Sequence, residues 1–205
     1  TVAHGLIRMD DGELAYITRR VDRGAHGEKI SMLDMCQLTN RLTEHKYRGA
    51  YVQLAETIKR YSATPMLDVQ RFWEIVLFSW ITGNSDMHCK NFSLLERIGI
   101  GYQLSPAYDL LAVWLTGIKD NDELAMPLVG FGADDHQTIA GFNRTSFVEA
   151  MLQSMIEEKI SQRIIDKMCA TTKKWPPIID SSFLSDELKS AYKNLVHSRI
   201  ERLTM

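Results

Sequence analysis

One segment constrains the fold of this chain more than any other, the stretch LDVQRFWEIVLFSWITG at residues 67–83. Apolar residues recur there at the spacing of one helical face, and further apolar residues fill the other faces. The first set is Val69, Phe72, Trp73, Val76 and Trp80, and the second is Ile75, Leu77 and Ile81. A helix that is apolar nearly all round is buried on all sides, so we expect this segment to form the centre of the core. We expect Asp68 to cap its start and Gly83 to end it.

A polar stretch, GNSDMHCKNFSLL at residues 83–95, follows this helix directly. After it, residues 92–96 and 101–104 are predicted to form two short strands around a glycine-bearing turn. An antiparallel hairpin brings its two ends close together. We therefore expect Asp86 and Asn91, which precede the hairpin, to converge with Asp109, which follows it.

The chemistry of these three residues suits a metal bound together with a phosphate. Carboxylate and amide oxygens are the hard ligands that Mg²⁺ prefers. Asp86 and Asn91 also have the D-x-x-x-x-N spacing of the protein-kinase catalytic loop, and the metal-binding aspartate of kinases likewise comes later in the chain. The alternative is that both aspartates only cap turns or helices. Cys89, beside His88, is not expected to be a nucleophile or metal ligand, because no third soft ligand stands nearby in sequence.

The remaining segments complete an α+β pattern that is mostly helical. Asp11-Gly12 predicts a tight hairpin turn near the start, and residues 32–42 are predicted to form a helix. Residues 116–144 have no clear period and are predicted to form a long loop. Three helices are expected after it, the first opened by a capping box between Ser146 and Glu149 and the second ended before Pro176-Pro177.

Composition narrows the cellular setting. The 205 residues carry a net charge of −2, which gives no global electrostatic reason to bind nucleic acid or a membrane surface. Three cysteines far apart indicate a reducing compartment, so we expect a cytoplasmic protein. The longest apolar run, residues 75–81, is too short to span a bilayer, and we expect no signal peptide. Because the chain begins with Thr1, it could be a fragment of a longer protein.

At this point the sequence resembles a known family. GNSDMHCKNFSLL followed by LSPAYDLL resembles the signature of HipA-like serine/threonine kinases, the toxins of bacterial toxin–antitoxin pairs. Their loop reads G-N/A-x-D-x-H-x-K-N-F-S, and their metal aspartate lies in a P-x-Y-D motif. RRVDR at residues 19–23 resembles the hinge of the family, and DMCQL at residues 34–38 resembles a further shared segment. The resemblance covers most of residues 15–112 and implies a kinase-like, helical large lobe with a short central hairpin.

The resemblance also implies roles in catalysis and metal binding. Asp86 would be the general base, and Lys90 would lie near the transferred phosphoryl group. Asn91 and Asp109 would hold Mg²⁺.

Further residues would bind the nucleotide. His88 and Tyr108 would lie against it, and the hinge residues Arg19, Arg20 and Val21 would border the adenine. The family often has an acidic residue where Arg19 stands, so this sequence departs from the pattern there.

The same resemblance divides the chain into two parts. Residues 1–22 would be the last strands of a kinase small lobe with its hinge, and residues 23–205 would be the helical large lobe. A kinase also needs a phosphate-covering loop and a strand lysine, but no glycine-rich loop precedes residue 20. We expect those parts upstream or on a separate small-lobe partner chain, as in split relatives of the family.

The implied reaction is transfer of the ATP γ-phosphoryl group to a serine of a protein, with ATP and Mg²⁺ as cofactors. By resemblance the target would be a protein of translation, typically an aminoacyl-tRNA synthetase, and the partner a DNA-binding antitoxin. Two alternatives stay open. One is a catalytically incomplete, kinase-like module that docks an antitoxin or another subunit. The other is a phosphotransferase that acts on a lipid or a small molecule.

Overall fold

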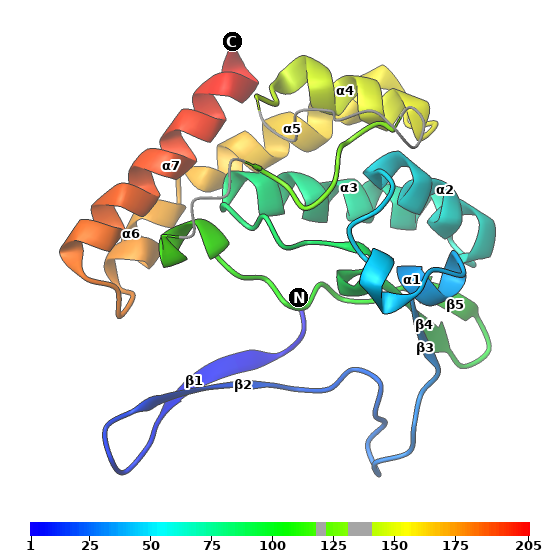
Figure 1. The fold of residues 1–205 in the computed structure, drawn as a ribbon, viewed down its shortest axis with the longest axis horizontal. Helices are drawn as coiled ribbons and strands as arrows, with labels where there is room; N and C mark the ends of the chain where they lie inside the picture. Colours follow the sequence, from blue (N-terminus) through cyan, green and yellow to red (C-terminus); the bar gives the residue numbers. More distant parts are fainter. Residues whose placement is uncertain (118–121, 131–140) are drawn as a thin grey trace.

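The computed structural model of the chain describes residues 1–117, 122–130 and 141–205. These residues form a helical body with two small antiparallel sheets (Figure 1). The expected class, α+β with mostly helix, is confirmed. None of the described helices combines the length and the apolarity that crossing a lipid bilayer requires.

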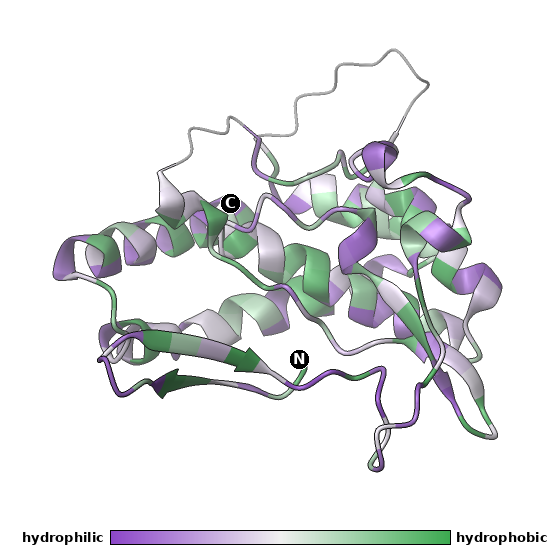
Figure 2. Cartoon of the chain, turned by 60° about the horizontal axis from the view of Figure 1, so that its bottom comes forward, coloured by the Kyte–Doolittle hydropathy of each residue, from purple (hydrophilic) through white to green (hydrophobic). Residues whose placement is uncertain are grey.

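The amino-terminal sheet is a hairpin of β1 (His4–Arg8) and β2 (Leu14–Thr18), as predicted. Gly12 in its turn has a φ of +88°, a conformation that favours glycine. The hairpin extends away from the helical body (Figure 1), and its apolar residues are visible along both strands (Figure 2). Exposed among them are Leu6, Ile7, Met9, Tyr16 and Ile17. Two strands alone bury little apolar surface, so this hairpin contributes little to the core.

The second sheet lies against the helical body and has the strand order β3-β4-β5. Its central hairpin joins β4 (Ser93–Arg97) to β5 (Gly101–Leu104), and the backbone N–H of Ser105 donates to the carbonyl of Ser93. The predicted hairpin is thus confirmed within one residue at each end. Its two ends lie side by side, which is the condition for Asp86, Asn91 and Asp109 to converge.

The helix predicted over residues 32–42 is wrong for most of its length. Met32–Asp34 form strand β3, in which Leu33 lies opposite Leu94. Only α1 (Met35–Leu38) is helical, and the side chain of Asp34 caps it by accepting a hydrogen bond from the Gln37 N–H. The helical spacing of apolar residues was misleading, because pairing with a strand some sixty residues away determines the conformation.

Helix α3 (Pro65–Ile81) is the buried centre of the fold, as predicted (Figure 1). Its start was predicted wrongly, because the helix begins at Pro65 and Asp68 lies within its first turn. Asp68 is fully buried and accepts hydrogen bonds from the Ser62 hydroxyl at 2.6 Å and from the Leu104 N–H at 2.9 Å. It therefore joins α3 to the end of β5. Gly83 lies just beyond the helix with a φ of +72°, in agreement with its predicted role.

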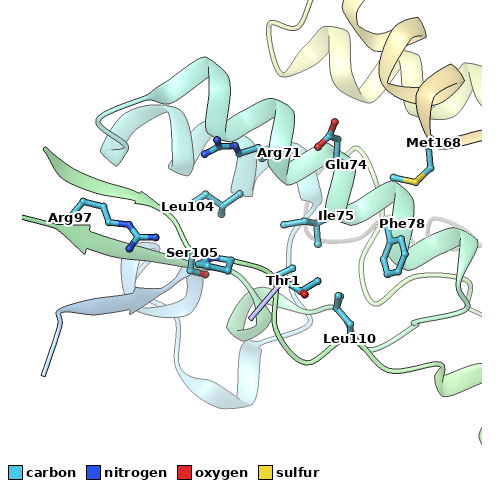
Figure 3. Close-up of a pocket in the computed structure, with 12 residues that line it drawn as sticks. Thr1, Arg71, Glu74, Ile75, Phe78, Arg97, Leu104, Ser105, Leu110 and Met168 are labelled. Atoms are coloured by element: carbon cyan, nitrogen blue, oxygen red, sulfur yellow. The ribbon is translucent and has the colours of Figure 1, made fainter. Parts of the chain in front are cut away.

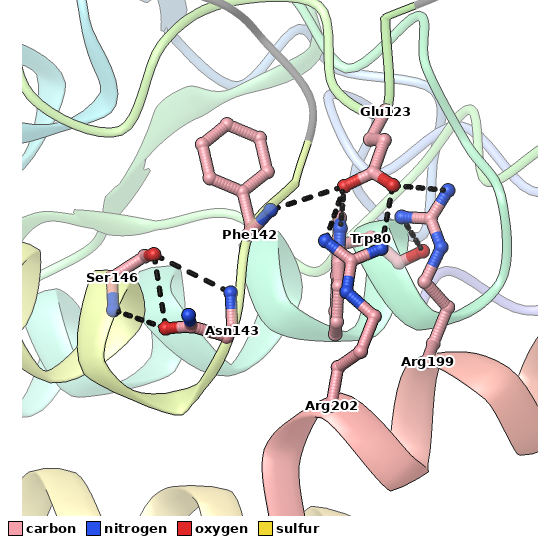
Figure 4. Close-up of polar contacts among 7 residues, drawn as sticks. All are labelled: Trp80, Glu123, Phe142, Asn143, Ser146, Arg199 and Arg202. Atoms are coloured by element: carbon pink, nitrogen blue, oxygen red, sulfur yellow. Dashed lines mark hydrogen bonds and ion pairs between the residues drawn. The ribbon is translucent and has the colours of Figure 1, made fainter. Parts of the chain in front are cut away.

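The remaining elements pack on α3 or on one another. They are α2 (Tyr51–Tyr61), α4 (Arg144–Gln153), α5 (Glu158–Thr172), α6 (Trp175–Asp180) and α7 (Asp186–Thr204), with 3-10 turns at Thr43–His45, Cys89–Asn91 and Val113–Thr116. The capping box predicted between Ser146 and Glu149 is wrong, because Asn143 caps α4 and accepts a hydrogen bond from the Ser146 N–H at 3.1 Å (Figure 4). Two stretches of the predicted loop over 116–144, residues 118–121 and 131–140, lie outside the described residues.

A largely buried ionic cluster fastens the described part of that loop to the helices (Figure 4). The Glu123 carboxylate accepts hydrogen bonds from Arg202 at 2.7 and 3.1 Å and from the Trp80 indole at 2.9 Å. Arg199 lies 3.5 Å from the same carboxylate and 4.8 Å from the centre of the Trp80 ring. The Phe142 N–H also donates to Glu123. One carboxylate thus connects residues 123 and 142 to α3 and α7.

Candidate active site

The loop between α3 and β4 is anchored to the core by contacts with buried side chains. The Tyr51 hydroxyl donates a hydrogen bond of 2.8 Å to the carbonyl of Met87, and both residues are fully buried. The Asn84 side chain accepts a hydrogen bond from the Asp86 N–H at 3.2 Å. Cys89 packs its sulfur 3.6 Å from the sulfur of Met126. The loop is therefore a fixed platform.

Asp86 lies at the surface of this platform, with its side chain 36% exposed. Its carboxylate accepts a hydrogen bond of 2.6 Å from the Tyr47 hydroxyl. The nearest His88 nitrogen, Nε2, lies 3.9 Å from the same carboxylate oxygen, which is too long for a hydrogen bond. An accessible carboxylate on a rigid loop suits a general base, since it must reach a substrate hydroxyl.

The side chain of Asn91 is oriented by the backbone of Asp86. The Asn91 side-chain N–H donates a hydrogen bond of 2.9 Å to the backbone carbonyl of Asp86. This bond assigns the amide nitrogen to the contact with Asp86 and leaves the Asn91 side-chain oxygen free of it.

Asp109 is brought to the same loop by contacts of its own backbone and of the residue before it. The Tyr108 hydroxyl donates to the Lys90 carbonyl at 2.8 Å and is bonded to the Ser93 hydroxyl at 2.6 Å. The carbonyl of Asp109 itself accepts from the Asn84 side chain at 3.4 Å. Asp109 has a φ of +55°, a left-handed conformation that aspartate and asparagine tolerate better than most residues. The structure thus places Asp86, Asn91 and Asp109 around one loop.

The arrangement fits a magnesium ion bound with phosphate. Among the described residues, neither the Asn91 side-chain oxygen nor the Asp109 carboxylate accepts a hydrogen bond, so both are available as ligands. Within the same residues, no group of three or more His, Cys, Asp and Glu side chains is placed to hold a metal. A metal here would have two protein ligands plus water and phosphate oxygens, which is the usual pattern for Mg²⁺.

Lys90 forms an ion pair that the sequence did not suggest. Its ammonium lies 3.3 Å from the carboxylate of Asp34, the residue that caps α1. The Lys90 side chain is 37% exposed, so it can reach solvent or a phosphate beside the loop. Its role near a transferred phosphoryl group stays a prediction.

His88 is buried and Tyr108 is half-buried. Only 5% of His88 is exposed. Burial and the nearby Lys46 ammonium lower the pKa of His88, so its imidazole is neutral at neutral pH. Its Nδ1 has no hydrogen-bond partner among the described residues. Burial raises the pKa of Tyr108 to about 12, so this hydroxyl keeps its proton. Contact of either residue with a nucleotide stays a prediction.

The three predicted hinge residues line one small cavity. Arg19, Arg20 and Val21 border about 260 Å³ together with Leu95 of β4 and Pro106. Pro106 precedes Tyr108 by two positions, so this cavity lies beside the segment that carries Asp109. It is rich in arginine, and the adenine contact predicted there has no further support from the geometry.

A second cavity, of about 430 Å³, lies between α3 and the segment that follows β5 (Figure 3). Ile75 and Phe78 of α3, Leu110 and Met168 form its apolar wall, and Arg71 and Glu74 lie at its side (Figure 3). None of the predicted site residues lines it. The site therefore does not coincide with this cavity.

Two residues near the site were missed from the sequence, Tyr47 and Asp34. Tyr47 stands in the polar stretch EHKYRG, where no periodic pattern marks it. Asp34 belongs to a segment that was predicted to be helical throughout. Burial raises the pKa of the Cys89 thiol to about 11, and its lack of a catalytic or metal-binding role stays a prediction.

Fold and loop together define a class of protein. A helical lobe carries a short hairpin, preceded by an Asp-Asn loop and followed by an aspartate, and this is the arrangement of a kinase-like large lobe. The chain belongs to the family described as the HipA-like C-terminal domain, whose family model matches residues 1–175.

Solved structures show the same fold. HipA of Shewanella oneidensis, determined with HipB and operator DNA, matches 99% of this chain with a TM-score of 0.74 and 21% identity. The proinflammatory kinase CtkA of Helicobacter pylori matches 98% with a TM-score of 0.58 and 16% identity. This chain covers 52% and 73% of those two chains.

Sequence relatives carry kinase names. Two Sinorhizobium fredii proteins named "Putative kinase Y4dM" and "Putative kinase Y4mE" are 36% and 31% identical over 56% and 51% of this chain. A Haemophilus influenzae protein named "Putative kinase" is 22% identical over 84% of it. The matched regions are 28%, 27% and 55% of those proteins, so the chain spans roughly half of its relatives or less.

Proposed function

We propose that this chain is the large lobe of a HipA-like serine/threonine protein kinase. The reaction is transfer of the γ-phosphoryl group of ATP to a serine hydroxyl of a protein. The observation that carries the proposal is the loop geometry, in which Asn91 is bonded to the backbone of Asp86 and Asp109 lies against the same loop.

In this proposal each residue has one task. Asp86 accepts the proton of the substrate hydroxyl and orients its oxygen for attack. Asn91 and Asp109 bind Mg²⁺, which neutralises charge on the phosphate oxygens. Lys90 lies beside the transferred group, and the buried platform under the loop keeps these groups in position.

The exposed hairpin supports the proposed division of the chain into two parts. Residues 1–22 are proposed to be the last strands of a small lobe with its hinge, and residues 23–205 the large lobe. Apolar side chains exposed on β1 and β2 support further strands packing there. Those strands would bring the phosphate-covering loop, on upstream sequence or on a small-lobe partner chain. Arg19, Arg20, Val21, His88 and Tyr108 would then border the nucleotide.

The partners are proposed from the relatives. The Shewanella HipA structure contains HipB and operator DNA, which supports a DNA-binding antitoxin as partner of this chain. An aminoacyl-tRNA synthetase as target, and the resulting arrest of translation, rest on the family resemblance alone. A cytoplasmic location rests on the cysteine content.

The alternative function is a binding module without chemistry. The exposed hairpin favours it for the chain as given, because that surface is suited to docking. The available ligands Asn91 and Asp109 favour the kinase, since a docking module has no need of them.

Incubating the whole protein with labelled ATP, Mg²⁺ and cell extract separates the possibilities. The kinase proposal predicts a labelled protein that yields phosphoserine on hydrolysis. Label found only on a lipid or small molecule would contradict the protein target and favour a small-molecule phosphotransferase. No transfer at all, with intact Mg²⁺-ATP supplied, would favour the binding module.

A further inference from the structure

Tyr47 makes a short hydrogen bond to the proposed general base. Its hydroxyl donates to Oδ1 of Asp86 at 2.6 Å. That distance is at the short end for a hydroxyl donor, as expected when the acceptor is an ionised carboxylate. Within residues 1–117, 122–130 and 141–205, no other side chain donates a hydrogen bond to this carboxylate.

The ring of Tyr47 is itself held in place. It meets the buried His88 ring edge-on, with the centroids 5.1 Å apart. The Lys46 ammonium lies 4.9 Å from the centre of the Tyr47 ring. The carbonyl of Lys46 accepts a hydrogen bond of 3.1 Å from the Cys89 N–H, which joins this segment to the loop. Tyr47 is therefore a fixed donor although 48% of it is exposed.

We propose that Tyr47 is a positioning residue for Asp86. A partly exposed aspartate has a soft terminal torsion, and the His88 nitrogen at 3.9 Å is too distant to restrain it. The Tyr47 hydroxyl holds Oδ1 and leaves Oδ2 to receive the proton of the substrate hydroxyl. This inference rests on the proposed kinase function and adds a residue that the catalytic-loop motif does not contain.

The same contact would also suit Tyr47 as a phosphoryl acceptor, and the test must distinguish this role from positioning. A hydroxyl within hydrogen-bond distance of a general base is also placed as a nucleophile. In that case Asp86 would take the phenol proton, the Tyr47 oxygen would bond to the γ-phosphorus of ATP, and ADP would leave. The double restraint of the ring, from His88 and Lys46, favours positioning over transfer to Tyr47.

The test is Tyr47→Phe in the whole protein, which keeps the ring and removes only the hydroxyl. Loss of one hydrogen bond to a charged group predicts a fall in kcat of about tenfold to a hundredfold. The affinity for Mg²⁺-ATP and the thermal midpoint should stay at the wild-type values, because the hydrogen bond that this substitution removes goes to Asp86 and to neither proposed metal ligand. Tyr61→Phe is the matched control, since Tyr61 is similarly exposed and its ring also lies beside a cationic side chain, that of Arg60. The Tyr61 hydroxyl makes no hydrogen bond to the described residues.

Each outcome decides the inference. A wild-type kcat for Tyr47→Phe overturns it, and so does a fall no larger than that of Tyr61→Phe. A loss of Mg²⁺-ATP affinity or of thermal stability that accounts for the lower kcat makes Tyr47 structural and also overturns it. Phosphate on Tyr47 of the wild-type protein, found by mass spectrometry, assigns it as an acceptor instead. If the wild-type protein itself transfers no phosphate, the proposed function fails, and the inference fails with it.

Discussion

The side-chain amide of Asn91 donates a hydrogen bond of 2.9 Å to the backbone carbonyl of Asp86. This bond explains the spacing of the two residues, because a turn of this length lets the later side chain reach back to the earlier carbonyl. It uses the nitrogen of the Asn91 amide and leaves the side-chain oxygen as the available ligand atom. A proposed base and a proposed metal ligand are thus joined by one contact.

Asp109→Asn tests the metal site. Asparagine has the same shape and tolerates the left-handed backbone of residue 109, so the fold should persist. Losing a negative ligand should weaken the apparent affinity for Mg²⁺ at least about tenfold. A magnesium titration of ATP binding measures this. Asp186→Asn is the control, since Asp186 lies fully exposed on α7, and equal affinities in the two variants would contradict the assignment.

Gly83→Ala tests how tightly the start of the loop is packed. An added Cβ would lie 2.8 Å from Leu195 Cδ2 and 2.8 Å from Trp114 Cβ, at a φ of +72°. Backbone strain of about 1 kcal/mol and crowding of about 1 to 3 kcal/mol should add in the free energy of unfolding.

Gly99→Ala is the matched control for that variant. Gly99 has a similar φ of +76°, but nothing lies within 4 Å of the added Cβ. It should therefore cost only the backbone strain. Urea unfolding of both variants gives the difference, and equal costs would show that the contact at Gly83 relaxes without penalty.

Much of the site was predictable because its signals are local. The all-round apolar pattern of α3 predicted a buried helix, and the glycine-bearing turn predicted the hairpin β4–β5. Together they predicted that Asp109 meets Asp86 and Asn91, since the ends of a hairpin adjoin.

The errors at residues 32–34, at Asp68 and at Tyr47 share a physical cause, which is contact between segments distant in the sequence. Residues 32–34 follow a helical spacing but pair with β4, and no local pattern reveals that partner. Aspartate is a common helix cap, but the Asp68 side chain is buried and accepts hydrogen bonds from Leu104 and Ser62 instead. Tyr47 and Asp86 are also far apart in the sequence, so the catalytic-loop motif alone could not include Tyr47.

Glu123→Gln tests the buried cluster that fastens the loop to α7. The substitution leaves Arg199 and Arg202 without their counter-charge in a largely buried site. We expect the free energy of unfolding to fall by about 2 to 4 kcal/mol. Asp180→Asn, which breaks an exposed pair with Lys193, should cost less than about 1 kcal/mol. Similar costs for the two variants in urea unfolding would contradict a structural role for the cluster.

The same cluster predicts how stability depends on pH. Burial by itself raises the pKa of Glu123, but hydrogen bonds from Arg202 and Trp80 and the nearby arginine charges outweigh it and lower the pKa. A lowered folded-state pKa stabilises the fold fully above the unfolded value of about 4.3, and this contribution is lost as pH falls through the folded value. The stability difference between wild type and Glu123→Gln should stay constant from about pH 7 to pH 5 and shrink below about pH 4. A difference that grows on acidification would contradict the direction of this shift.

Asp86→Asn in the whole protein tests the central claim most directly. The measurement is the rate of phosphoryl transfer from labelled ATP to a protein serine, together with the affinity for Mg²⁺-ATP from calorimetry. If Asp86 is the general base, the rate falls by about a hundredfold to ten-thousandfold while the affinity stays within about threefold of wild type. A rate of transfer equal to that of the wild-type protein would contradict the account.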